Sequence, residues 1–239
     1  MSDYALRLAE TLATLERIAS DYSPAALASS LAAEDMVLTD MILRGGLPIG
    51  IFTLDTGRLH AETTGLIARI KETYGAEIAV YRPDENDVAA YVEQHGLNGF
   101  YESVESRKEC CRIRKVEVLK LALQGNKAWI TGLRRAQSST RIDLDVQEHD
   151  AAHGIAKFNP LADWTEEDIW HYIRSRKVPY NPLHNKGYPS IGCEPCTRAI
   201  QPGEDIRAGR WWWEQPETKE CGLHVVDGKL VRKQKVFTS

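Results

Sequence analysis

The stretch IGIFTLDTG, residues 49–57, carries the clearest strand pattern in the chain. It is apolar and partly β-branched, which is typical of a buried strand, and it ends in Asp-Thr-Gly, a turn signal. The segment that follows, HAETTGLIARIKETYG at 60–75, has apolar residues at helical spacing and a closing glycine. A buried strand that leads directly into a helix is the repeating unit of a parallel α/β sheet.

The same alternation continues on both sides of this stretch. Short apolar runs predict further strands at 25–31, 77–84 and 127–133. We therefore expect an α/β fold whose sheet is mainly parallel, with helices on both faces and ligands bound beyond the carboxyl ends of the strands. The helical patterns lie at 4–20, 33–46, 84–96 and about 107–124.

The pattern changes after about residue 150. A turn is predicted at Asn159-Pro160, and Thr165 is placed to cap a following helix. Prolines then interrupt the chain repeatedly, so its last part should be rich in loops. We expect one domain over residues 1–239, made of an α/β core at about 1–180 and a C-terminal segment at about 181–239.

Composition excludes several classes of protein. The chain has 239 residues, of which 43% are hydrophobic and 27% are charged, with a net charge of −4. These values are ordinary for a globular protein, and the acidic balance argues against general nucleic-acid binding. The N-terminus lacks the pattern of a signal peptide, and no apolar run reaches the ~18 residues that would span a membrane. We therefore expect a cytoplasmic protein.

Four of the five cysteines fall into two pairs. Cys110 and Cys111 are adjacent in KECCRIRK (108–115), and Cys193 and Cys196 form a CxxC pair in GCEPC (192–196). Two such pairs can supply four sulfur ligands, which suits zinc or an iron–sulfur cluster. Neighbouring helical residues point about 100° apart, so both members of the doublet reach a bulky cluster more easily than a single ion. The alternative is that all four are buried small side chains.

The fifth cysteine, Cys221, lies in KECGLH (219–224). A thiol near positive charge ionises more easily and becomes a nucleophile, and the alternative is an idle surface thiol.

Basic residues gather in three places, although the chain as a whole is acidic. Three such groups near strand ends and cysteines indicate a phosphate or sulfate ligand, and the alternative is a set of solvated faces. Polar residues at three strand ends should converge with them: Ser29-Ser30 before Glu34-Asp35, Asp55-Thr56-Gly57, and the segment from Gly132 to Arg141. The basic groups are Arg112, Arg114 and Lys115; Arg134, Arg135 and Arg141; and Arg198, Arg207 and Arg210.

Taken together, these blocks closely resemble the assimilatory adenylyl-sulfate (APS) reductases of bacteria and plants. The likeness runs from about residue 25 to 224, and its cysteine combination of CC, GCxPC and ECGLH is highly specific. The other blocks are SSLAAED (29–35), FTLDTGRLHAET (52–63), TGLRRAQS (131–138) and KFNPLADWTEEDIWHYI (157–173).

The resemblance implies a Rossmann-like adenine-nucleotide α-hydrolase fold and a thioredoxin-dependent oxidoreductase of sulfate assimilation. Cys221 would attack the sulfur of APS, expel AMP and carry an S-sulfonate on a mobile C-terminal segment. A thiol of thioredoxin or of a glutaredoxin-like carrier would then release sulfite. One [4Fe-4S] cluster per chain would be held by Cys110, Cys111, Cys193 and Cys196.

The resemblance also implies roles for residues around the substrate. Lys115 would lie between cluster and substrate, and Arg207 and Arg210 would close over the phosphosulfate. Ser29, Ser30, Glu34 and Asp35 match a phosphate-loop-like segment at a helix start, where backbone N–H groups favour anions. Asp55, Thr56 and Gly57 would line the nucleotide pocket, Arg134 and Arg135 would lie at its mouth, and His224 would tune the Cys221 thiol.

Three alternatives differ in substrate or in class. A reductase of PAPS, the 3′-phosphorylated nucleotide, or one of dual specificity uses the same chemistry, but PAPS-restricted enzymes generally lack the two cysteine pairs. An ATP-pyrophosphatase-type adenylating enzyme would carry an SGGxDS loop, which SSLAAED is not. A non-catalytic zinc or cluster-binding module would leave Cys221 and the arginine clusters unexplained. The sequence leaves homo-oligomer formation open.

Overall fold

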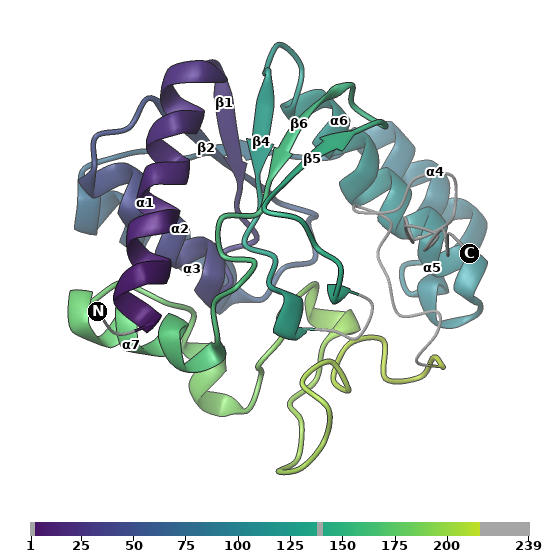
Figure 1. Ribbon diagram of the computed structural model, residues 1–239. Coiled ribbons are helices and arrows are strands. Elements are labelled where there is room, and N and C mark those ends of the chain that lie inside the picture. The colour runs from purple at the N-terminus through teal and green to yellow at the C-terminus, as the bar shows by residue number, and fades with distance from the viewer. Residues whose placement is uncertain (1–2, 138–140, 216–239) are drawn as a thin grey trace, which may run out of the picture.

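The protein is seen here as a computed structural model that describes residues 3–137 and 141–215 (Figure 1). Its centre is a six-stranded sheet with the strand order β3-β2-β1-β4-β6-β5. All neighbouring strands are parallel except β5 and β6, which pair antiparallel at one edge. The mainly parallel sheet predicted from the sequence is therefore confirmed. The strands are β1 (Ala25–Ala28), β2 (Ile49–Leu54), β3 (Ala79–Tyr81), β4 (Ala128–Ile130), β5 (Gln147–Asp150) and β6 (Ile155–Phe158).

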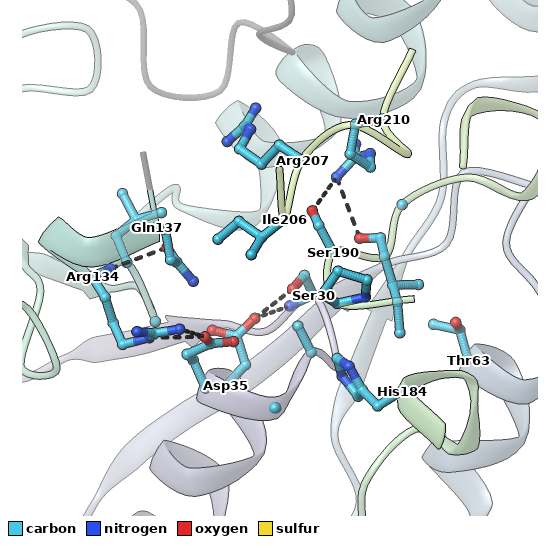
Figure 2. A pocket seen from close by; sticks show the side chains of 18 of the residues that line it. Ser30, Asp35, Thr63, Arg134, Gln137, His184, Ser190, Ile206, Arg207 and Arg210 are labelled. Atoms are coloured by element: carbon cyan, nitrogen blue, oxygen red, sulfur yellow. Dashed lines mark hydrogen bonds and ion pairs between the residues drawn. The ribbon is translucent and has the colours of Figure 1, made fainter. Parts of the chain in front are cut away.

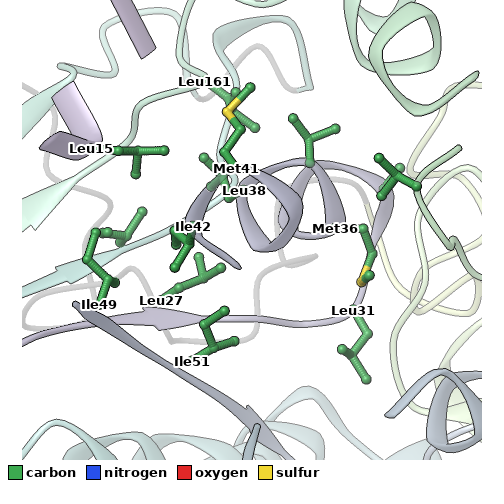
Figure 3. Close-up of a cluster of buried hydrophobic side chains, with 14 of the residues drawn as sticks. Leu15, Leu27, Leu31, Met36, Leu38, Met41, Ile42, Ile49, Ile51 and Leu161 are labelled. Carbon is green, nitrogen blue, oxygen red and sulfur yellow. The ribbon is translucent and has the colours of Figure 1, made fainter. Parts of the chain in front are cut away.

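Helices cover both faces of this sheet, as expected (Figure 1). On one face, the aliphatic side chains of α1, α2, α3 and α7 form the larger core against β1, β2 and β4, and Figure 3 shows part of it around Leu27 and Met41. On the other face, Leu119 and Ala122 of α6 pack against Phe52 and Trp129. The helices are α1 (Asp3–Asp21), α2 (Ala33–Arg44), α3 (Ala61–Tyr74), α4 (Glu85–His95), α5 (Val104–Cys111), α6 (Glu117–Ala122) and α7 (Glu166–Arg176).

Two local features differ from the sequence-based prediction. The single helix expected at about 107–124 is α5 and α6 joined by a π-helical turn at Arg112–Val116. The antiparallel pair of β5 and β6 was not predicted, because the sequence of β5, QEHD, has no apolar residue to mark it as a strand. The predicted cap at Thr165 is confirmed, since its side chain accepts from the Asp168 N–H in a reciprocal capping box at the start of α7.

The segment after α7 returns to the sheet as loops and short 3₁₀ turns, drawn green to yellow in Figure 1. Two isolated bridges hold it in place: Leu59 pairs with Cys193, and Thr197 pairs with Arg210. This path carries the CxxC pair to the loop that follows β2. In the two described ranges, no helix combines the length and the apolar character that a membrane crossing requires.

Candidate functional site

A cavity of about 940 Å³ opens at the carboxyl ends of β1, β2 and β4, where ligands of parallel sheets bind. Its size suits a nucleotide-sized ligand. Figure 2 shows how its polar side chains converge from segments far apart in the sequence. Of the residues predicted to bind substrate, the cavity is lined by Ser29, Ser30, Glu34, Asp35, Thr56, Lys115, Arg134, Arg207 and Arg210.

The start of α2 forms one wall of this cavity. Ala32, Ala33 and Glu34 line the cavity at the first turn, and no side chain caps this helix end. The first backbone N–H groups of a helix lack intrahelical partners and carry partial positive charge, so they attract anions. Leu31, which precedes them, has φ of 63° and a completely buried side chain. The positive φ turns the chain sharply from the end of β1 into α2.

Asp35 fixes the loop that precedes this helix. Its Oδ2 accepts hydrogen bonds from the Ser30 N–H at 2.7 Å and from the Ser30 hydroxyl at 2.6 Å (Figure 2). Burial raises the pKa of Asp35 to about 6, although the hydrogen bonds from Ser30 act in the opposite direction. A Cβ atom on Gly132, at the end of β4, would lie 2.4 Å from Asp35 Oδ1. Glycine at this position therefore allows the first turn of α2 to approach β4.

Arg134, predicted at the mouth of the pocket, lies buried in an ion pair with Glu34. Its Nε and Nη2 donate to Glu34 Oε1 at 2.9 and 2.7 Å, and its Nη1 donates to the Trp164 carbonyl at 3.3 Å. The pair largely cancels the charge that each residue would present to an anion. It also joins α2 to the segment after β4, so it shapes this wall of the cavity.

Three of the predicted substrate residues do not line the cavity. Asp55 accepts from the Gly57 N–H at 3.0 Å and forms an ion pair with Arg82 at 3.1 Å, so it stabilises the turn after β2. Gly57 takes φ of 71° in the same turn, a conformation that suits glycine. Arg135 points instead to an exposed ion pair with Asp163.

The opposite wall is cationic. Lys115, Arg207 and Arg210 line it, and Figure 2 shows the two arginines on the loop above Ser30. Arg210 donates to the Ser190 hydroxyl and, at 3.4 Å, to the Ile191 carbonyl. A Cβ atom on Gly192 would lie 2.5 Å from Arg210 Nη2, so the absence of a side chain there makes room for the guanidinium. An anion between this wall and the start of α2 would meet positive charge on both sides.

The four paired cysteines lie next to this wall. Cys110 and Cys111 at the end of α5, together with Cys193 and Cys196, line one hollow of about 20 Å³. Lys115 and Trp211 line both this hollow and the large cavity. The sequence pairs are thus brought together from segments about eighty residues apart, and Lys115 stands between the thiols and the cavity.

Polar and cationic groups surround the sulfur atoms. The Thr56 hydroxyl lies 3.2 Å from Cys193 Sγ, and Arg114 donates to the Thr56 carbonyl at 2.7 Å. Burial raises the pKa of Cys110, and the charge of Arg114 acts in the opposite direction. Burial would raise the pKa of Cys193, but Lys115 and the Thr56 hydroxyl bring it below its usual value. Burial and the neighbouring Cys193 raise the pKa of Cys196 to about 12. The site therefore holds four sulfur atoms in unequal electrostatic surroundings.

Over residues 3–137 and 141–215, no three side chains of histidine, cysteine, aspartate or glutamate form a group that could hold a metal ion. The donors that meet at the hollow are nevertheless all sulfur, with aromatic walls from Phe100 and Trp211. Sulfur-only donor sets of four are the chemistry of zinc or of iron–sulfur clusters.

Several residues at the site were not predicted from the sequence. Arg114 was noted only as part of a basic group, although it donates to the Thr56 carbonyl and its charge opposes the rise in the pKa of Cys110. His184 also lines the large cavity; its Nε2 is buried without a hydrogen-bond partner, and burial lowers its pKa. No local pattern marks either role. Cys221 and His224 lie outside the described residues.

Comparison with known proteins gives consistent matches. A family model described as phosphoadenosine phosphosulfate reductase domain matches residues 24–199. Adenosine 5′-phosphosulfate reductase from Burkholderia cepacia is 62% identical over 89% of this chain and 85% of its own length. The protein of the same name from Allochromatium vinosum is 58% identical over 91% of this chain and 85% of its own length.

Two solved structures show the same fold at low identity. The phosphoadenylyl-sulfate (PAPS) reductase from Candida auris, in a phosphate complex, matches with a TM-score of 0.68 and 24% identity, over 80% of this chain and 90% of that one. The NMN synthetase from Francisella tularensis matches with a TM-score of 0.54 and 12% identity, over 75% of this chain and 73% of that one. At these identities the likeness concerns the fold alone.

Proposed function

Because the chain belongs to the phosphoadenosine phosphosulfate reductase domain family, we propose that it reduces adenosine 5′-phosphosulfate to sulfite and AMP in sulfate assimilation. It is an oxidoreductase that acts on a sulfur group, as are the adenosine 5′-phosphosulfate reductases to which it is 62% and 58% identical. Its fold is of the Rossmann-like adenine-nucleotide α-hydrolase type. The observation that carries the proposal is the position of Lys115, which lines both the nucleotide-sized cavity and the hollow of the four cysteines.

The cavity suits the anionic end of this substrate. The start of α2 offers backbone N–H groups from one side, and Lys115, Arg207 and Arg210 offer cations from the other. When a nucleophile attacks the sulfur of the phosphate–sulfate anhydride, the S–O bond breaks and negative charge moves to the departing phosphate of AMP. Fixed cations at that place stabilise the transition state more than the ground state.

The four paired cysteines are the proposed ligands of one [4Fe-4S] cluster per chain. Four sulfur donors from two segments meet at one hollow, and Thr56 and Arg107 hydrogen-bond two of them, which supports this assignment. Such outer hydrogen bonds orient metal ligands and offset their charge. When bound, the cluster would supply a compact, polarisable charge held by four thiolates.

Cys221 is the proposed nucleophile, with His224 tuning its thiol. The Cys221 thiolate would form an S–S bond to the sulfonate group as AMP leaves, giving a Cys221 S-sulfonate. A thiolate of thioredoxin or of a glutaredoxin-like carrier would then attack Cys221 Sγ and expel sulfite. The second carrier thiol would break the resulting mixed disulfide, so the carrier dithiol supplies both electrons. A cytoplasmic address fits this scheme, because thiol carriers keep that compartment reducing.

The test uses anaerobically purified, reduced protein without a carrier thiol, mixed with APS or with PAPS and mapped by mass spectrometry. We expect a sulfonate on Cys221 with APS, which reduced thioredoxin removes. An adduct formed only with PAPS would assign the 3′-phosphorylated substrate instead. The absence of an adduct with either nucleotide, in protein shown to hold iron and sulfide, would reject Cys221 as the nucleophile. Zinc in place of iron, again without an adduct, would favour a non-catalytic metal-binding module.

A further inference from the structure

Arg107 is the most completely buried cation that the structure describes at the cysteine site, and the proposed function uses its contact with Cys111 but not its ion pair. Its side chain is 0% exposed and forms an ion pair with Glu214, whose side chain is 3% exposed. The pair is bidentate, because Nε donates to Oε1 at 2.7 Å and Nη2 donates to Oε2 at 2.9 Å. A planar fork of this kind fixes the direction as well as the distance between two segments.

The two partners belong to different parts of the site. Arg107 lies on α5 one helical turn before Cys111 and hydrogen-bonds the side chain of that cysteine. Glu214 lies near the end of the described chain, seven residues before Cys221 in the sequence. Seven residues span at most about 25 Å, so the position of Glu214 limits where Cys221 can reach.

Trp211 completes the link between these parts. Arg107 and Arg210 both make cation–π contacts with the Trp211 ring. Their guanidinium carbons lie 4.7 and 4.5 Å from the ring centroid, respectively. Its backbone N–H donates to the Cys196 carbonyl at 3.1 Å, and its carbonyl accepts from the Glu214 N–H at 2.9 Å. Trp211 also has φ of 41°, a strained value for a bulky residue that persists only where the surroundings impose it.

We propose that Arg107 is a positioning residue. Through Glu214 it fixes residues 211–215, which precede Cys221 in the sequence, relative to the cysteine site and the substrate cavity. The inference rests on the proposed function, because it gives Cys221 the role of nucleophile. An ion pair buried this deeply depends on both partners, since removal of one charge leaves the other away from water without its bidentate counter-charge. The ion pair therefore favours a single position of residues 211–215.

The experiment compares Arg107→Lys and Glu214→Gln with the wild-type holoprotein. Arg107→Lys keeps the charge but loses the bidentate fork, and Glu214→Gln keeps the shape but loses the charge. Lys108→Gln, an exposed neighbour on the same helix, is the control. Four quantities are measured anaerobically: iron and sulfide content, affinity for APS, the single-turnover rate of Cys221 sulfonation, and hydrogen–deuterium exchange of the peptide over residues 211–215.

We expect Glu214→Gln, which leaves Arg107 beside Cys111, to keep the iron content and to bind APS within about threefold of wild type. Arg107→Lys also changes the hydrogen bond to Cys111, so its rate and affinity are expressed per iron-loaded protein. In both variants sulfonation should slow at least tenfold and exchange at 211–215 should become faster. Lys108→Gln should match wild type in all four measurements. A normal sulfonation rate in both variants would overturn the proposal. So would a loss of rate that equals the loss of iron or of APS binding, because Arg107 would then be structural only.

The exchange measurement separates this inference from the proposed function. If the wild-type protein itself forms no sulfonate, Cys221 is not the nucleophile. The positioning role of Arg107 is then tested by hydrogen–deuterium exchange alone. Faster exchange at 211–215 in the variants would still show that the Arg107–Glu214 pair holds these residues in place, and unchanged exchange would reject this role. Should Glu214→Gln not fold, Glu214→Asp keeps the charge, shortens the reach and provides the same comparison.

Discussion

The hydroxyl of Thr56 lies 3.2 Å from Sγ of Cys193, although 137 residues separate them in the sequence. Thr56 follows β2 and lines the large cavity, and Cys193 belongs to the sulfur hollow. One buried side chain therefore joins the loop after β2 to the cysteine site, and it also accepts from the Arg58 N–H at 3.2 Å.

Replacing Thr56 with valine removes this hydroxyl with little change of shape. We expect metal retention to weaken by about 10- to 100-fold, the usual effect of losing a group that supports a metal ligand. The measurement is the rate at which a strong iron chelator bleaches the anaerobic protein. Thr56→Ser keeps the hydroxyl and should behave like wild type, whereas equal bleaching rates for the valine and serine variants would show that the hydroxyl does not support Cys193.

The Asp35 carboxyl should make APS binding depend on pH. Its folded pKa of about 6 lies above the usual value because of burial, so Asp35 is neutral below that pH and negative above it. A negative charge beside an anion site opposes binding, and APS itself does not titrate between pH 5 and 8. We expect the affinity of a Cys221→Ser variant for APS to rise as pH falls through about 6, and the dependence to vanish when Asp35→Asn is added. A pH dependence that persists in the asparagine variant would assign it to another group.

The same carboxyl gives a stability prediction with a definite sign. Its pKa is higher in the folded than in the unfolded protein, so its contribution is most favourable below about pH 4 and is lost as pH rises through about 6. A difference of about two pKa values corresponds to roughly 3 kcal/mol in the free energy of unfolding. Urea titrations at pH 4 and pH 7 should therefore show that the free energy of unfolding of Asp35→Asn, relative to that of wild type, is higher at pH 7. A constant difference between the two proteins would contradict the raised pKa.

Glycine at position 132 is required by packing. A Cβ atom there would lie 2.4 Å from Asp35 Oδ1 and 2.9 Å from Glu34 Cβ, so α2 must move away from β4. We expect Gly132→Ala to destabilise the protein by about 1–3 kcal/mol and to weaken APS binding. Gly65→Ala is the control, since that glycine lies exposed on α3 with nothing within 4 Å, and the change should stabilise the helix by about 0.5–1 kcal/mol. Equal effects of the two substitutions, measured by thermal unfolding, would argue against the close contact.

The parts of this architecture that could be predicted from the sequence are those with a local signature. The strand at 49–54 is mostly apolar, and parallel pairing brings its end beside Ser29, which follows β1. β1 pairs in turn with β4, which Gly132 follows. The polar strand at 147–150 carries no such signature, because it forms a sheet edge that pairs on one side only.

The part of the site that could not be predicted depends on contacts distant in sequence. Nothing near Arg107 marks it as buried, since its partner Glu214 lies 107 residues away. The same applies to Arg134, whose charge is neutralised by Glu34 from 100 residues away. The π-helical turn at Arg112–Val116 was also missed, because its residues fit an uninterrupted helical pattern. Such turns are frequent at functional sites, and this one holds Lys115.

Lys115 should contribute more to the reaction than to substrate binding. Lys115 lines both the sulfur hollow and the cavity, and it also lowers the pKa of Cys193. We expect Lys115→Ala to reduce the rate of Cys221 sulfonation by about 100- to 1,000-fold, as for the loss of one fixed group that stabilises developing charge. Affinity for APS should fall much less, because the start of α2, Arg207 and Arg210 still face the anion.

Lys120→Ala, an exposed change on α6, should leave both quantities unaltered. Lys115→Arg should recover part of the rate, since it keeps the charge. If instead affinity and rate fell together by the same factor in Lys115→Ala, the lysine would act by uniform binding of the anion and not on the transition state.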